Sequence, residues 1–417
     1  MFRGLRAEVF PPFERLELVF SPVQNKPADL AEVHLFTGVN GTGKTRILSL
    51  LATTLGNFSV LQKRLKELPQ PIQLSVSSNL VGEKVREWDS GWQIFHGSLH
   101  QQTHGETTGW ASRVPAFAYN GIAYVSDAQV APMGQVKRPE RPACLSFQRV
   151  ETTSQELLQA ITNLKVQAAM DTLNAGEAGG SETQPTKIVR ALEATITSVT
   201  GIKFMFQVAS YPTPVLEVSW GRSRLSFNLL PDGLRSIIGT LAHAVVMMDA
   251  WLQGKGNPLE TEAVLLLDEI EGHLHPAWQR RILPAFQHLF PKAQIFVATH
   301  SPFVIASLNH GWIYPLTLDK DGKARASNPV PASPGDSYIS VVEEIMGVKE
   351  WYDPETEQLL AEFRKNRDSA YAGDTSAQAR ARQLAMDIGK RSMELDYMMG
   401  RELSQMDRQL SKSTVKK

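Results

Sequence analysis

The chain has 417 residues, 42% of them hydrophobic and 21% charged, and its 43 basic and 43 acidic side chains give a formal net charge of +0. This balance does not indicate a nucleic-acid partner, although a local basic patch is compatible with it. The single cysteine, Cys144, excludes an internal disulfide framework and favours a reducing compartment. No apolar run approaches the roughly 20 residues of a membrane helix, and residues 1–6 lack the apolar core of a signal peptide. We therefore expect a cytoplasmic protein that does not enter a membrane.

Residues 1–150 predict the N-terminal part of an α/β core. Alternating apolar residues on either side of Pro11 and Pro12 predict an antiparallel pair of strands, and the next apolar run predicts a strand that enters a glycine-rich turn. A helix, an irregular insertion with some helix, and another strand follow. In chain order these elements are expected at 5–10, 16–20, 31–37, 46–55, 60–113 and 117–125.

Residues 151–200 predict a helical lobe, because apolar side chains recur at helical spacing on both sides of a Gly/Ser-rich linker. Residues 201–330 predict the C-terminal part of the core, with three alternating strands, a long apolar helix and buried strands separated by a helix. Residues 331–417 predict a helical extension, with a helix start at 353–355 and one long charged helix over 376–412. We expect the apolar stripe of that last helix to pack on the body or on a partner.

The first motif that carries chemistry is a Walker A pattern, G-x-x-x-x-G-K-[ST]. It is formed by Gly38, Val39, Asn40, Gly41, Thr42, Gly43, Lys44 and Thr45. The glycines let successive backbone N–H groups converge on phosphates, Lys44 supplies a cation, and Thr45 supplies a hydroxyl ligand for Mg²⁺. The helix that follows directs its N-terminal dipole at the same anion. The pattern lies between a predicted strand and a predicted helix, as an ATP-binding loop requires.

The second motif is a Walker B pattern, in which the apolar run 263–267 ends in Asp268 and Glu269. Asp268 is expected to hold Mg²⁺ through water. Glu269 is expected to orient and deprotonate the attacking water. His300 ends the next predicted strand, where it would reach the γ-phosphate or the attacking water. We therefore predict Lys44, Glu269 and His300 as catalytic residues.

The order of these motifs resembles the ABC-class ATPases of the SMC/RecF/OLD group. The resemblance rests on Walker A, a long insertion, Asp-Glu-Ile-Glu-Gly-His-Leu-His-Pro at 268–276 and Thr-His-Ser-Pro at 299–302, and it covers most of residues 1–316. It implies an ABC-type P-loop NTPase fold with a mixed sheet, an inserted helical lobe and a helical C-terminal extension. It also implies ATP and Mg²⁺ as ligands, a D-loop over Glu271–His275, and a switch histidine at His300.

The family's signature motif, which completes the partner subunit's ATP site in a head-to-tail dimer, matches Leu230-Pro231-Asp232-Gly233. Asp232 and Gly233 are the expected nucleotide contacts, with Asp232 as the N-cap of the following helix. Pro231 replaces the usual serine and has neither a hydroxyl nor an N–H to offer a phosphate. This departure leaves dimer-dependent hydrolysis in doubt, and slow turnover or an ATP clamp would fit it.

Three other features are open. Gln129 and Gln148 are both candidates for the family's Q-loop glutamine. Basic residues of a proline-containing loop could contact nucleic acid, although such a loop is more often simply solvated. Histidines spaced by four residues would share a helical face and could bind metal, but two glycines weaken that helix. The loop residues are Lys137, Arg138 and Arg141, and the histidines are His96, His100 and His104.

The resemblance extends to ATPases of Septu, PARIS, retron and OLD systems, which pair such a domain with a nuclease. About 100 residues follow the core here without the acidic strand ends of a Toprim nuclease. We therefore expect a homo-oligomeric ATPase of an anti-phage defence system that controls a separate effector. A RecF/SMC-like DNA repair ATPase is the first alternative, and it would show a basic surface. A nucleotide-gated scaffold with little turnover is the second, and Pro231 supports it.

Overall fold

A computed structural model shows how these segments fold. It describes residues 1–54, 72–78, 90–95, 98–102, 116–120, 154–175, 183–209, 215–253, 255–332, 334–335 and 337–414. The chain divides into two units, Met1–Met346 and Gly347–Lys417. The expected motifs all lie in the first unit.

A mixed sheet forms the centre of the first unit, in the order β14-β13-β3-β12-β11-β7, with β15 also paired to β13. Its five parallel strands are β3 (Glu32–Gly38), β7 (Ala116–Asn120), β11 (Ala263–Asp268), β12 (Ala293–Ala298) and β13 (Trp312–Leu318), and the antiparallel ones are β14 (Ala324–Ala326) and β15 (Val330–Pro331). All six residues of β11 and of β12 are buried, as expected for parallel strands covered on both faces. The parallel strands place the loops after β3, β11 and β12 at one edge of the sheet.

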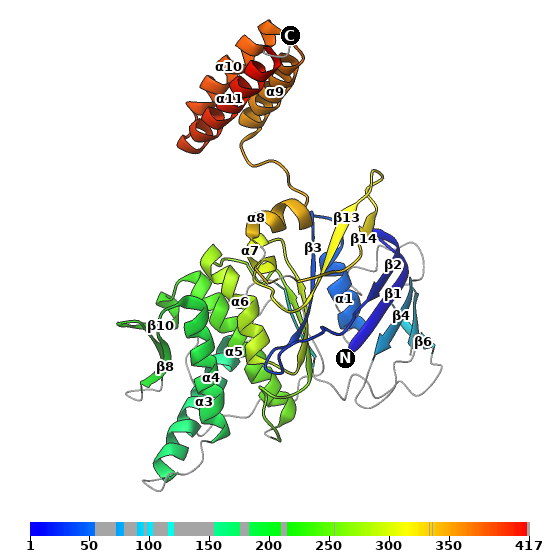
Figure 1. Ribbon diagram of the computed structural model, residues 1–417. Coiled ribbons are helices and arrows are strands. Elements are labelled where there is room, and N and C mark those ends of the chain that lie inside the picture. The colour runs from blue at the N-terminus through cyan, green and yellow to red at the C-terminus, as the bar shows by residue number, and fades with distance from the viewer. Residues whose placement is uncertain are drawn as a thin grey trace. The chain divides into compact units, whose positions relative to one another are not determined.

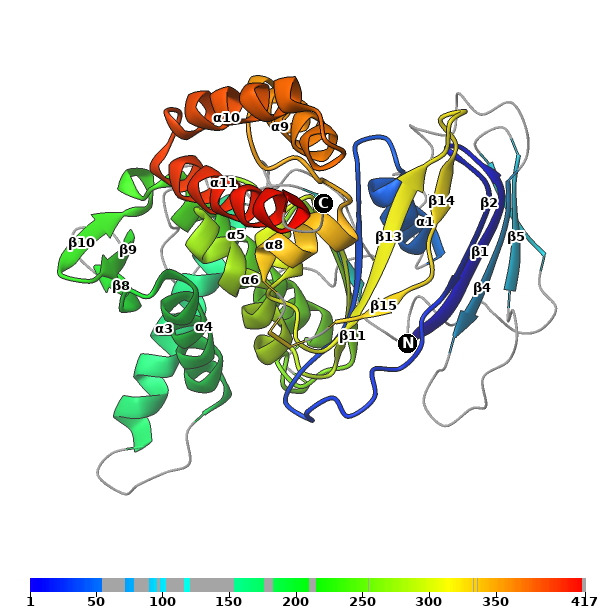
Figure 2. The ribbon, with the colours of Figure 1, turned by 45° about the horizontal axis from the view of Figure 1, so that its top comes forward.

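A second, antiparallel sheet lies beside the first, in the order β2-β1-β4-β5-β6 (Figures 1 and 2). Its strands are β1 (Phe2–Phe10), β2 (Phe13–Val19), β4 (Ile72–Ser78), β5 (Ser90–Phe95) and β6 (Ser98–Gln102). An irregular insertion with some helix is expected over 60–113, and the residues of it that the structure describes are strands. The reason is the alternation of Ile72, Leu74 and Val76 with polar residues, which has the period of a strand.

Buried polar bonds hold β1 against the core sheet. Arg3 Nη1 donates to Glu32 Oε1 at 2.6 Å, and Gln294 Nε2 donates to the same oxygen at 2.8 Å. The His34 ring lies between Glu32 and the Tyr314 hydroxyl, at 2.9 and 3.0 Å. Because buried polar groups are costly to leave unpaired, this network fixes where the β1–β2 hairpin sits over the sheet.

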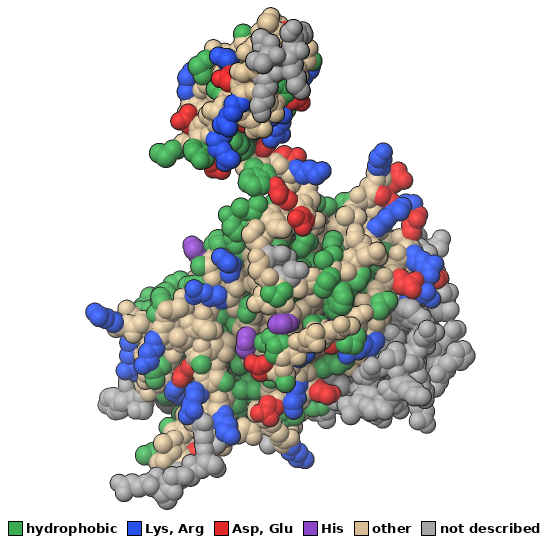
Figure 3. Space-filling model, in the orientation of Figure 1, with side chains coloured by type: hydrophobic (Ala, Val, Ile, Leu, Met, Phe, Trp, Pro, Cys, Tyr) green, Lys and Arg blue, Asp and Glu red, His purple; other side chains and the backbone are tan. Residues whose placement is uncertain are grey.

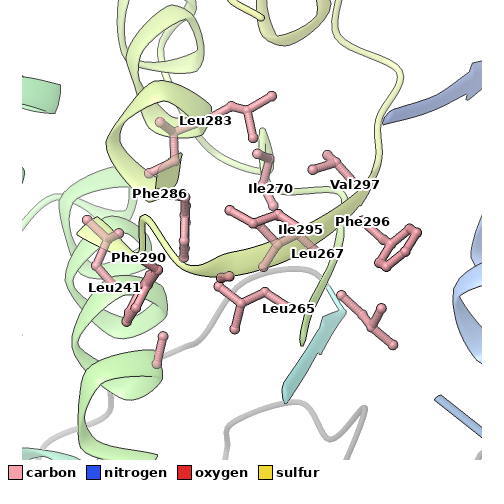
Figure 4. Packing of buried hydrophobic residues seen from close by; sticks show 14 of the residues in the cluster. Leu241, Leu265, Leu267, Ile270, Leu283, Phe286, Phe290, Ile295, Phe296 and Val297 are labelled. Carbon is pink, nitrogen blue, oxygen red and sulfur yellow. The ribbon is translucent and has the colours of Figure 1, made fainter. Parts of the chain in front are cut away.

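Helices cover both faces of the core sheet. α1 (Lys44–Thr54) lies on the side that faces the N-terminal sheet, whereas α5 (Asp232–Leu252) and α6 (Pro276–Leu289) cover the other (Figures 1 and 2). Apolar side chains of α5 and α6, including Leu241 and Phe286, pack with those of β11 and β12 (Figure 4). Most residues of α5 are buried, which explains its nearly continuous apolar sequence.

The segment before α5 forms the lobe, with helices α3 (Ser154–Ala175) and α4 (Gln184–Thr200) and a three-stranded sheet of β8 (Phe204–Ala209), β9 (Val215–Trp220) and β10 (Ser223–Ser226). The alternation of Leu225, Phe227 and Leu229 predicts that β10 extends to Leu229. The strand instead ends at Ser226, because the chain turns into a 3-10 helix at Phe227–Leu229. The N-cap of α5 is Pro231, so the expectation that Asp232 caps this helix is wrong. Asp232 is its first residue and instead pairs with Arg235 one turn later.

The second unit is a three-helix bundle of α9 (Pro354–Tyr371), α10 (Thr375–Gly389) and α11 (Met393–Thr414). Asp353 caps α9 as expected. The single helix expected over 376–412 is wrong, because the chain turns between Gly389, where α10 ends, and Met393, where α11 begins. The apolar stripe packs inside this bundle rather than on the body or a partner, with Leu395, Met399 and Met406 fully buried in its core.

Candidate nucleotide site

The Walker A residues form the turn between β3 and α1. Gly38, Gly41 and Gly43 have φ angles of 149°, 86° and 87°, a region that favours glycine. A Cβ atom on Gly38 would lie 2.2 Å from the Leu316 carbonyl oxygen, and one on Gly43 would lie 2.6 Å from the Phe13 ring. The backbone conformation and the packing of this turn therefore both require glycine.

Lys44 is held inside the turn. Its Nζ donates to the carbonyl oxygens of Gly38 at 2.8 Å and Val39 at 3.0 Å, and the residue is only 6% exposed. Burial lowers the pKa of Lys44 to about 8, against the attraction of Asp268, Glu269 and Glu271, which raises it. A cation that lies so close to three carboxylates is suited to neutralise the phosphates of a bound anion.

The Walker B acids follow β11. Asp268 is buried, while Glu269 is exposed and has a φ of 53°, an uncommon conformation for a residue other than glycine. The backbone N–H of Glu269 donates to the Ala298 carbonyl at 2.9 Å, which continues the pairing of β11 with β12. This turn places Glu269 and His300 next to each other at the sheet edge.

One cavity of about 490 Å³ brings the motifs together. It is lined by Pro11, Pro12, Asn40, Gly41, Gly43, Lys44, Thr45, Arg46, Glu269 and His300. The three predicted catalytic residues thus share a single cavity, although Glu269 and His300 are more than 200 residues from Lys44 in the chain. Burial, and then the charge of Lys44, lowers the pKa of His300, whereas Glu269 opposes this by raising it.

Three of the lining residues were missed by the sequence reasoning. Pro11 and Pro12 come from the β1–β2 turn, and Arg46 donates from α1 to the Pro11 carbonyl. Only the position of Arg46 directly after Walker A could have pointed to it. The contribution of the β1–β2 turn depends on the packing of the N-terminal sheet.

A polar link behind the cavity was also missed. Glu271 Oε1 accepts a hydrogen bond from the backbone N–H of His300 at 2.8 Å. Burial raises the pKa of Glu271, and the bond from His300 opposes this by lowering it. In the sequence, the only sign of this link is that Glu271 is a second acid two residues after Glu269.

The signature residues lie apart from this cavity. Gly233 packs against the turn after β11, where a Cβ atom would lie 2.9 Å from the His273 carbonyl oxygen. Asp232 is exposed at the start of α5, and the N-cap Pro231 makes no side-chain bond there. Neither Asp232 nor Gly233 lines the cavity.

The remaining candidates are outside the site. Gln129, Gln148, Lys137, Arg138 and Arg141 lie outside the described residues, as do His96 and His104. His100 lies in strand β6, so the helical histidine face does not form. Within the described ranges, no group of three or more His, Cys, Asp or Glu side chains could hold a metal ion.

The oxygen donors near the cavity suit a magnesium ion. Thr45 lines the cavity and Asp268 lies buried at the end of β11. A hydroxyl and a carboxylate are hard ligands of the kind Mg²⁺ prefers, and this ion usually keeps several waters and binds through one or two protein groups plus phosphates. Thr45 and Asp268 are therefore the residues that would hold it.

A parallel sheet with a Walker A turn, an acid pair after a neighbouring strand and a histidine after the next one defines an ABC-type P-loop nucleotide-binding fold. The comparisons agree with this class. Residues 210–306, which include α5, the Walker B acids and His300, match the family described as "AAA domain, putative AbiEii toxin, Type IV TA system". This part of the chain therefore resembles an AAA-family ATPase domain.

The chain is homologous to a Septu protein and to a retron probable ATPase. It is 26% identical to the Septu protein PtuA of Bacillus thuringiensis over 156 residues. These residues make up 36% of this chain and 39% of that protein. It is 30% identical to a retron Vc95 probable ATPase of Vibrio cholerae over 167 residues. These residues make up 38% of this chain and 31% of that ATPase. The chain thus matches less than half the length of these relatives.

Among solved structures, the SMC head domain from Thermotoga maritima is similar at a TM-score of 0.42 and 15% identity, covering 79% of this chain and 98% of that one. None of the helices in the described ranges is long and apolar enough to cross a membrane.

Proposed function

We propose that this chain binds ATP with Mg²⁺ and hydrolyses it as the regulatory ATPase of a bacterial anti-phage defence complex with a separate effector. The observation that carries the ATPase proposal is the single cavity shared by the Walker A turn, Glu269 and His300. The similarity to Septu PtuA and a retron ATPase supports the defence role. A separate nuclease or toxin is our proposal for the effector.

The motif residues at the cavity have separate roles in the proposed reaction. The Walker A N–H groups and Lys44 bind the phosphates, and Glu269 orients the attacking water and accepts its proton. His300 is suited to contact the γ-phosphate or that water. Bound Mg²⁺ would neutralise charge on the phosphate oxygens, held by Thr45 and Asp268.

The first experiment measures ATP turnover, ATP affinity and particle mass for wild type, Lys44→Ala and Glu269→Gln. We expect Glu269→Gln to lower kcat by about 10²-fold or more while ATP still binds, because only the general base is lost. Lys44→Ala should lose ATP binding, because it removes the phosphate cation. Glu260→Gln removes an exposed acid outside the cavity and is the matched control.

Equal turnover of wild type and Glu269→Gln would contradict the catalytic assignment. If both were inactive while particle mass still depended on ATP, a nucleotide-gated scaffold would explain the chain better. Pro231 at the N-cap of α5, without a side-chain bond, is the observation that favours this second candidate. Restoring the family serine with Pro231→Ser should then raise turnover.

The defence role has its own test, which is phage plating on a host that expresses the chain together with its flanking genes. We expect protection with wild type and Glu260→Gln, and loss of protection with Lys44→Ala. Protection that survives Lys44→Ala would separate the chain's biological role from ATP. A DNA-repair role is less favoured, because the 43 basic and 43 acidic side chains of the chain balance, whereas a RecF-like protein is expected to be basic. Figure 3 shows side chains of both charges on one face of the first unit.

A further inference from the structure

The turn after Walker B contacts three other parts of the first unit, two through hydrogen bonds and one through close packing. Glu271 accepts the His300 backbone N–H at 2.8 Å. Gln279 Nε2 donates to the Leu274 carbonyl at 2.9 Å, and Gln279 Oε1 accepts from the Ser301 hydroxyl at 2.6 Å. The His273 carbonyl lies against Gly233 at the start of α5. Residues 271–275 therefore connect the switch loop, α6 and the signature helix.

A carboxyl group is an unusual choice for the position of Glu271. Its side chain is largely buried, and within the described residues its second oxygen, Oε2, has no hydrogen-bond partner. Burying a carboxyl group with an unsatisfied oxygen costs free energy, and an apolar residue at this position would avoid that cost. The carboxyl group accepts the His300 N–H, and hydrogen bonds from the Thr299 side chain and from its own backbone N–H also lower its pKa. An apolar side chain could not hold residues 299 and 300 in this way.

The bond acts on the part of the chain that presents His300 to the cavity. The Thr299 N–H donates to the Phe36 carbonyl at 3.1 Å, which fixes the preceding residue to β3. The Ser301 hydroxyl accepts from the N–H groups of Phe303 and Val304, which fixes the following residue to α7 (Pro302–Ile305). Between these two anchors, Glu271 holds the His300 backbone itself.

We propose that Glu271 is a positioning residue for ATP hydrolysis: through its bond to the His300 N–H it sets where the imidazole lies in the cavity and ties that position to residues 271–275. This inference rests on the proposed ATPase function. What it requires of residue 271 is a hydrogen-bond acceptor rather than a negative charge. The same bond would carry a movement of the signature helix to the histidine, since Gly233 contacts His273 in the same turn.

The test compares Glu271→Ala and Glu271→Gln with wild type in kcat, ATP affinity and melting temperature. We expect Glu271→Ala to lower kcat by about tenfold or more with ATP affinity unchanged, because small misplacements of a catalytic group are costly in rate. Glu271→Gln keeps an acceptor and should stay within about threefold of wild type. Glu193→Ala is the matched control, since Glu193 also accepts a backbone N–H, from Phe206 at 2.8 Å, but in the helical lobe.

A double-mutant cycle asks whether Glu271 acts through His300. In a His300→Ala background the backbone bond remains but the ring is gone, so adding Glu271→Ala should lower kcat no further. Full additivity of the two effects would overturn the proposal. So would a Glu271→Gln variant as inactive as Glu269→Gln, because the charge would then be what matters.

A third readout does not depend on turnover. Hydrogen exchange at the His300 amide, followed with ¹⁵N-labelled histidine, should be slow in wild type and Glu271→Gln and at least tenfold faster in Glu271→Ala. Unchanged exchange in Glu271→Ala would overturn the proposal even if Glu271→Ala failed to turn over ATP. Failure of the ATPase function itself would be seen separately, as equal turnover of wild type and Glu269→Gln.

Discussion

His243 shows what burial does to one side chain. It lies on α5, and burial lowers its pKa to about 4. The unfolded chain returns this histidine to a pKa of about 6.5, so below that pH the unfolded state binds the extra proton. His243 therefore makes the folded state less stable as the pH falls from about 6.5 towards 4.

We expect the free energy of unfolding to fall with pH in this range, with a contribution from His243 of at most about 1.4 kcal/mol per pH unit. His243→Gln should flatten that dependence, as measured by urea unfolding at pH 7.5, 6, 5 and 4.5. The exposed His288 on α6 offers the control, His288→Gln. If both variants showed the pH dependence of wild type, burial of His243 would not be its source.

Single residues of the site differ in how far the sequence could predict them. Lys44 and Thr45 were predictable because their partners are the adjacent Walker A residues. The link from Glu271 to His300 was not, because it joins positions 29 apart whose meeting depends on the pairing of β11 with β12. Pro11 and Pro12 reach the cavity only because the hairpin packs over the sheet.

At the scale of elements, the start of α5 must approach the turn after β11 closely. Gly233 allows this approach, since a Cβ atom there would lie 2.9 Å from the His273 carbonyl and 3.1 Å from the Trp278 ring. Backbone oxygen atoms cannot move aside as a flexible side chain can. The contact therefore sets the position of the signature helix relative to residues 271–275.

Gly233→Ala should shift the start of α5 and cost about 1–3 kcal/mol of stability, as overpacking does in other cores. Chemical denaturation measures this cost, and turnover should fall with it if residues 271–275 carry the shift to His300. Gly400→Ala is the comparison, because Gly400 lies in α11 with open space around it. There the higher helix propensity of alanine should leave stability equal or raise it by up to about 1 kcal/mol. Equal stability of the two variants would show that the Gly233 contact relaxes freely.

At the scale of the whole molecule, the candidate site and the helical bundle belong to different units of the chain. All predicted site residues lie in Met1–Met346, and the bundle in Gly347–Lys417 has a core of its own. A chain ending at residue 346 should therefore fold and bind ATP with the affinity of the full chain. Calorimetry of both forms, with Lys44→Ala in each as the negative control, measures this. A truncated protein that is folded but no longer binds ATP would mean that the bundle contributes to the site.

The sequence by itself determined the chemistry of the site and the class of the fold, because Walker A, the Walker B acids and the switch histidine are each short contiguous patterns next to apolar strands. It also indicated the lobe and the helical C-terminal part through their periodicity. Only the tertiary structure decided that β3, β11 and β12 are neighbours, so that Lys44, Glu269 and His300 share one cavity. It also decided that the last apolar stripe is the inside of a bundle and that Glu271 holds His300. These features depend on contacts between distant segments, and local periodicity carries no information about which segments meet.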